Sequence, residues 1–70
     1  MDVKAFYNDL ADWVLSINQQ SQTLGPTEYW EFILTTAGEL SKKYHERPLV
    51  KAVLHAHIDY LEQAWKGRSD

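Results

Sequence analysis

The side chains that could carry out chemistry in this 70-residue chain are three histidines and three pairs of acids. In each pair the carboxylates are three residues apart, a spacing that puts both on the same side of an α-helix. Two such pairs facing each other inside a helical bundle can hold Mg²⁺. All three pairs lie off the apolar faces of their helices, which favours acids in solvent, so we predict no metal site and no cofactor: Asp9 with Asp12, Glu28 with Glu31, and Asp59 with Glu62.

Two of these pairs, Glu28/Glu31 and Asp59/Glu62, are similar to the acidic pairs of the all-α nucleotide pyrophosphatases. The resemblance implies a Mg²⁺-dependent hydrolase of nucleotides as an alternative function. The chain is short for that family, and it lacks the fuller cluster with three acids on one helix. It also contains no cysteine, no glycine-rich phosphate loop and no serine in a strand-turn-helix setting. We therefore predict that the protein is not an enzyme.

His57 lies in the middle of an apolar stripe and is the candidate pH-sensitive group. The favoured interpretation is a neutral core histidine that shares a hydrogen bond with a hydroxyl of Tyr7, Tyr44 or Ser41. The alternative is a switch: burial lowers the pKa of a histidine, so protonation at acid pH would open the core or an interface. His55 is expected in solvent, and the two histidines cannot bind one metal ion from one helix.

Apolar residues repeat at helical spacing in three stretches and predict an all-α fold. We expect a single domain over residues 1–70, a small three-helix bundle. The few residues between the last two helices predict that these pack as an antiparallel hairpin. The predicted helices cover residues 2–18, 27–45 and 48–66.

Local signals bound these helices. Asp2 and Thr27 are the predicted N-caps, and Gly67 is the predicted C-cap of the last helix. Gly38 lies near the edge of an apolar face, where it predicts the close approach of another helix. The residues predicted to face the core are Val3, Phe6, Tyr7, Leu10, Trp13, Val14 and Ile17, then Trp30, Ile33, Leu34, Ala37, Leu40 and Tyr44, and finally Val50, Val53, Leu54, His57, Ile58, Leu61, Ala64 and Trp65.

Four large apolar or aromatic residues remain outside the predicted core of a monomeric bundle. A small core gains stability from a partner, and clustered exposed apolar residues are typical of interfaces. We therefore predict a protein–protein interaction module whose partner is a second copy, in a homodimer, or another protein. The interface candidates are Leu15, Phe32, Leu49 and Tyr60.

The charge pattern bears on the remaining classes of partner. The formal net charge is −3 with both signs interspersed, which leaves no broad basic surface for nucleic acid. A small DNA-binding regulator stays an alternative, although the third helix carries mixed charges where a recognition helix would be basic. No apolar run approaches the roughly 20 residues of a membrane span. Without cysteine or a signal-peptide pattern, the chain is predicted to be soluble and cytoplasmic; it resembles the small helical proteins of bacteria and their phages.

Overall fold

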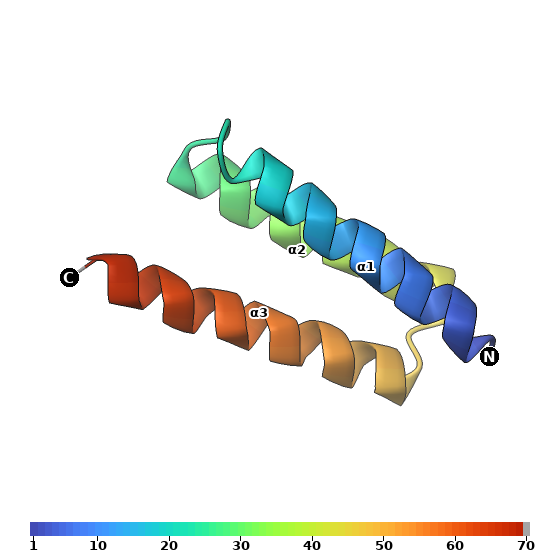
Figure 1. Cartoon of the computed structure of the whole chain (residues 1–70). Coiled ribbons are helices and arrows are strands. Elements are labelled where there is room, and N and C mark those ends of the chain that lie inside the picture. The colour runs from blue at the N-terminus through green and yellow to red at the C-terminus, as the bar shows by residue number, and fades with distance from the viewer. Residues whose placement is uncertain (70) are drawn as a thin grey trace.

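The computed structural model describes residues 1–69, with side chains placed for residues 1–65. Over this part the chain forms three α-helices and no strand, which confirms the predicted all-α bundle. The chain reverses direction at both connections, so that α1 and α3 run the same way and α2 runs opposite to them (Figure 1). The helices are α1 (Val3–Gln20), α2 (Pro26–Lys43) and α3 (Pro48–Ser69).

Capping explains where the helices begin. The Asp2 carboxylate accepts a hydrogen bond from the backbone N–H of Ala5 at 3.1 Å, which confirms Asp2 as the N-cap of α1. Gly25 is the N-cap of α2, so the prediction of Thr27 was wrong. The reason is Pro26, whose fixed φ angle suits the first helical position. The prediction that Gly67 caps the C-terminus of α3 was also wrong, because α3 continues through Gly67 to Ser69.

The turn between α2 and α3 ends α2 two residues earlier than predicted. His45 and Glu46 both adopt positive φ angles, 60° and 52°. The N–H of His45 donates to the carbonyl of Lys42 at 3.0 Å, and that of Glu46 donates to the carbonyl of Ser41 at 2.8 Å. This pair of bonds is the Schellman pattern that closes helix C-termini. Two non-glycine residues therefore hold a left-handed conformation to end α2 sharply.

All three helices contribute to one hydrophobic core. Four residues predicted to be in the core are instead exposed, namely Val3, Tyr7, Leu34 and Ala64. Phe32, which was expected to project away from the core, is half-buried and packs against it. The buried core residues are Phe6, Trp13 and Ile17 of α1, Ile33, Ala37 and Leu40 of α2, and Val50 and Leu54 of α3.

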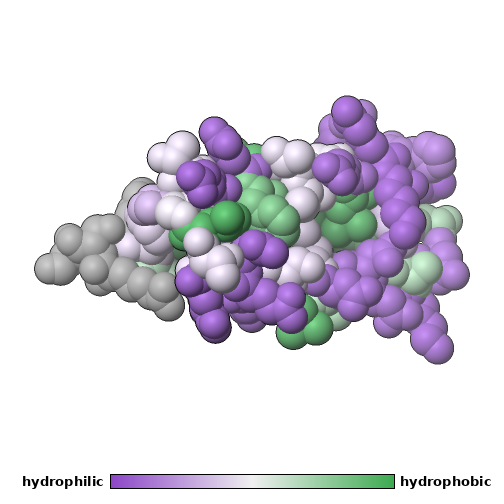
Figure 2. Space-filling model, turned by 90° about the horizontal axis from the view of Figure 1, so that it is seen from above, coloured by the Kyte–Doolittle hydropathy of each residue, from purple (hydrophilic) through white to green (hydrophobic). Residues whose placement is uncertain are grey.

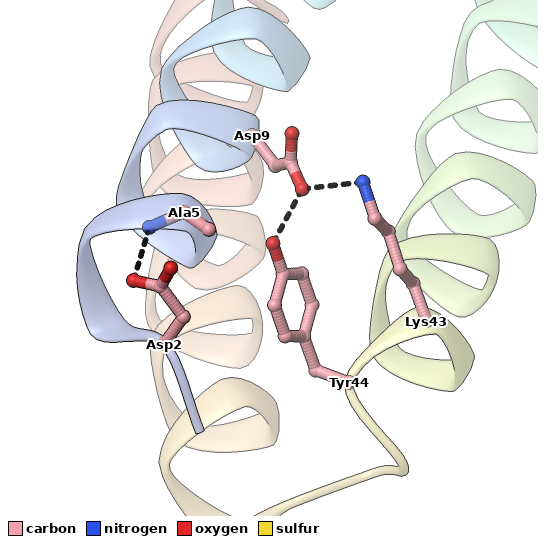
Figure 3. A network of polar contacts seen from close by, with 5 residues as sticks. All are labelled: Asp2, Ala5, Asp9, Lys43 and Tyr44. Carbon is pink, nitrogen blue, oxygen red and sulfur yellow. Dashed lines mark hydrogen bonds and ion pairs between the residues drawn. The ribbon is translucent and has the colours of Figure 1, made fainter.

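Two polar links join α1 to α2. The Asp9 carboxylate accepts from the Lys43 ammonium at 2.7 Å and from the Tyr44 hydroxyl at 2.5 Å (Figure 3). Farther along, the Trp13 indole N–H donates to the Thr36 hydroxyl at 2.8 Å. The bonds donated by Tyr44 and Trp13 are partly buried, and they fix the register of one helix on the other, because shifting either helix would leave their donors unpaired.

The burial of α3 decreases along its length. Val50 and Leu54 are buried near its start, whereas Ile58 and Trp65 are only partly buried. Figure 1 shows the axis of α3 inclined to that of α1, with the wider separation at the C-terminal end of α3. There the Trp65 ring lies 6.4 Å from the ring of Tyr29 and 6.2 Å from that of Trp30. These large rings make the contact between α2 and α3 at the wider end.

None of the helices, over the residues described, is both long and apolar enough to cross a membrane. Figure 2 looks down on the α1 and α2 side of the molecule. This face is mostly hydrophilic, and its apolar residues form separate patches along the middle.

Candidate functional site

A groove runs along the seam between α2 and α3. It consists of two adjoining hollows of about 430 and about 350 Å³, and Leu34 lines both. We refer to it as the α2/α3 groove. Its lining residues are Trp30, Leu34, Ala37, Gly38, Ser41 and Lys42 of α2, Glu46 of the turn, and Lys51, Leu54, His55, Ile58, Glu62 and Trp65 of α3.

Apolar side chains form the middle of the α2/α3 groove. Ala37 and Leu54 belong to the buried core, and Ile58 is half-buried. The side chain of Leu34 stands above them and is 58% exposed. A leucine in that position leaves most of its apolar surface in water, which is unfavourable by about 25 cal/mol for each Å² that a partner could cover.

Gly38 lies one helical turn after Leu34, and its surroundings are open. A Cβ atom built at Gly38 would meet no atom within 4 Å. The predicted close approach of another helix was therefore wrong for this chain alone. The glycine instead leaves a shallow gap on the surface of α2, directly beside the exposed Leu34 side chain.

The ends of the α2/α3 groove carry opposite charges. The end near the turn has Lys42 and Lys51, with Glu46 as the one acid among the lining residues there. The end near Trp65 has Glu62. All of these charged side chains are exposed, so their charges face solvent or a partner rather than the core.

The predicted interface residues lie elsewhere. Leu15 and Tyr60 are 57% and 64% exposed, and Leu49 is also exposed, but none of them lines the α2/α3 groove. Leu49 and Tyr60 lie three turns apart on the same side of α3. Leu15 lies on α1 about 200° around the helix from buried Trp13, hence on its outer side. The structure therefore does not gather these candidates into one surface.

His57 lies where α3 faces α1. Its ring packs edge-on against Trp13 with centroids 5.4 Å apart and lies 5.9 Å from the Tyr60 ring. Burial lowers the pKa of His57 below its ordinary value of 6.5. The hydroxyl of Tyr44, one of its predicted partners, donates to Asp9. His57 is therefore a half-buried aromatic contact at the α1/α3 seam.

The acid pairs do not form a metal centre in the part of the chain that the structure describes, where no three His, Asp or Glu side chains converge suitably. Asp9 already accepts from Lys43 and Tyr44, whose hydrogen bonds lower the pKa of its carboxyl. In return, the hydrogen bond to Asp9 raises the pKa of Tyr44 to about 12. Glu62 lies in the α2/α3 groove, beside Trp65.

Sequence reasoning missed the α2/α3 groove because it assigned Leu34 to the core. The available signal was the sequence Leu34, Gly38, Lys42, in which a large apolar residue, a gap and a base follow one another along one face of a helix. Comparison of the chain with known protein families, with curated proteins and with solved structures finds no match.

Proposed function

We propose that this protein acts by protein–protein contact and that the α2/α3 groove binds an amphipathic helix of the partner. The observation that carries the proposal is the exposed Leu34 side chain, which stands between two hollows with apolar walls. Exposed apolar surface with a polar rim marks protein interaction sites. The lysines and glutamates at the two ends of the groove supply that rim.

The shape of the α2/α3 groove favours a helical partner. Its walls are two neighbouring helices, and a third helix packs against such a pair with its ridge of side chains in the seam. Trp30 and Trp65 at one end offer large rings of the type that dominates binding energy in interfaces. A helix seated here would add to a core that is small for a stable domain. We place this activity in the cytoplasm, as the sequence predicts.

A photo-crosslinking amino acid placed at single positions in the cells that produce the protein tests this function. Position 34 should give a defined adduct with one protein, whether a second copy or another chain. Position 15 is the matched control, because Leu15 is equally exposed on the outer side of α1. Position 60 tests the predicted surface that includes Leu49 and Tyr60. Adducts at position 15 or 60 with none at 34 would remove the α2/α3 groove as the binding site.

A further inference from the structure

We propose that the helix bound in the α2/α3 groove belongs to a second copy of this chain, which lies antiparallel to the first. This inference rests on the proposed function and names its partner. The two chains would be related by a two-fold axis perpendicular to the helices. α2 would then pack on α2 of the second copy, and α3 on α3, as a four-helix bundle with both α1 helices outside.

The spacing of charges along the α2/α3 groove supports a second copy. On α2, Glu31 precedes Lys42 by eleven residues, and on α3, Lys51 precedes Glu62 by eleven residues. Eleven residues are three helical turns, about 16 Å. Lys42, Lys51 and Glu62 line the groove. Glu31 is exposed and does not line it, but eleven residues before Lys42 it lies on the same side of α2 as Lys42, within about 20° around the helix.

Within one chain, charges of the same sign lie toward the same end of the groove. Because α2 and α3 run in opposite directions, Lys42 and Lys51 share one end of the α2/α3 groove, together with Glu46. Glu62 lines the other end, and the direction of α2 places Glu31 toward that end. Like charges on both sides of a groove end favour a partner of the opposite charge. A second copy turned by 180° brings its acids to the lysine end and its lysines to the acid end. The same copy turned to lie parallel would set lysines against lysines.

The register of this dimer also fits the uncharged residues. Lys42 facing Glu31 of the second copy puts the two-fold axis near positions 36 and 37 of α2. Lys51 facing Glu62 puts it near positions 56 and 57 of α3. Leu34 then faces position 39 of the second copy, next to the gap that Gly38 leaves there, and the same contact is repeated by symmetry. A projecting leucine and an open glycine, one turn apart, make the surface complementary to itself.

Cross-linking of the purified wild-type chain tests the arrangement directly. An equal mixture of ¹⁴N- and ¹⁵N-labelled protein is treated with a zero-length carbodiimide, which joins an ammonium to a carboxylate. We expect mixed-isotope peptides that link Lys51 to Glu62 and Lys42 to Glu31. Neither link can form within one chain, because each pair is about 16 Å apart along one helix. Mixed-isotope links that join other pairs instead would overturn the proposed register.

Paired charge reversals test the partner. One variant carries Lys42→Glu with Lys51→Glu, and the other carries Glu31→Lys with Glu62→Lys. Light scattering over a concentration series should show that each variant alone dimerises at least tenfold more weakly than wild type, and that their equal mixture regains the dimer. A control with Lys4→Glu and Asp12→Lys on α1 should dimerise as wild type does. Circular dichroism confirms that all the variants remain helical.

Gly38→Leu supplies a test that does not depend on charge. The open space at Gly38 admits a side chain in the monomer, so the variant should stay folded while losing the dimer. Wild type that stays monomeric up to about 1 mM, or a Gly38→Leu variant that dimerises normally, overturns the proposed dimer. Position 34 could then still cross-link to a different protein in cells, in which case the proposed function stands and only the identity of the partner fails.

Discussion

The Asp9 carboxylate is the point where two side chains at the end of α2 meet α1 (Figure 3). An ionised acceptor strengthens a hydrogen bond and disfavours loss of the donor proton. This explains why the pKa of Tyr44 is raised to about 12. The same bonds lower the pKa of Asp9, so its contribution to stability is present above pH 3.8 and is lost as the pH falls below that value.

Asp9→Asn should therefore move the titration of Tyr44 back toward its ordinary pKa of 10. The amide keeps a hydrogen-bond acceptor but removes the negative charge that opposes ionisation of the phenol. Ultraviolet difference spectra of tyrosinate formation between pH 9 and 13 would measure the shift. Tyr44→Phe identifies the late-titrating group, since it should remove that phase from the wild-type curve. An unchanged curve in Asp9→Asn would show that the carboxylate does not control this phenol.

His57 should make the stability of the bundle depend on pH below its ordinary pKa of 6.5. Its pKa is lowered in the folded state, so the unfolded chain binds the proton more tightly, and stability falls as the pH drops below 6.5. Chemical denaturation at several pH values should show this loss in wild type and less of it in His57→Gln. His55→Gln is the matched control, because His55 is exposed. An equal loss in wild type and His57→Gln would contradict the prediction.

The turn between α2 and α3 is the element in which local strain is greatest on the described backbone, since His45 and Glu46 both have positive φ angles. A left-handed conformation costs a residue with a Cβ atom about 1 kcal/mol or more, and glycine avoids this cost. His45→Gly should therefore raise the free energy of unfolding by about 1 kcal/mol, after the greater freedom of glycine in the unfolded chain is considered.

The same substitution at His55 provides the control for that turn. His55 lies inside α3, where glycine is a poorer helix former than histidine, so His55→Gly should lower stability by roughly 0.5 kcal/mol. Thermal and urea melts in dilute solution compare the two variants. If His45→Gly also destabilises the protein, the left-handed turn is held by contacts that outweigh its strain.

The helices could be predicted from sequence because their signals are local: the apolar period, the Asp2 cap and the proline at the start of α3. The errors concern which part of each apolar face is covered. A period of 3.6 residues defines an apolar arc, but the packing angle of the neighbouring helix decides which side of that arc is buried. Leu34 and Tyr7 lie at the uncovered side. The links from Asp9 to α2 and from Trp13 to Thr36 depend on the register between helices, which no local pattern specifies.

At the scale of the whole molecule, the two seams beside α2 differ in kind. The α1/α2 seam is fixed by hydrogen bonds and an ion pair as well as by buried apolar residues. The α2/α3 seam leaves Leu34 and parts of two tryptophans uncovered along a groove. A bundle of this size has only a few kcal/mol of net stability. A partner that covers the α2/α3 groove would therefore raise the free energy of unfolding by a large fraction of its total.

Substituting Leu54 and Leu34 in turn distinguishes the stability of a single chain from the stability that association adds. Leu54 is 2% exposed, and Leu54→Ala should lower the free energy of unfolding by about 2–5 kcal/mol at every protein concentration, because the cavity lies inside one chain. Leu34→Ala should have little effect in dilute solution, where its side chain is in water. The loss of stability caused by Leu34→Ala should grow as the protein concentration rises, since a second copy that binds only the folded state stabilises wild type by mass action. Melting temperatures of both variants and wild type from 1 µM to 1 mM make the comparison. A cost of Leu34→Ala that is large and constant over this range would place the role of Leu34 within the chain rather than between chains.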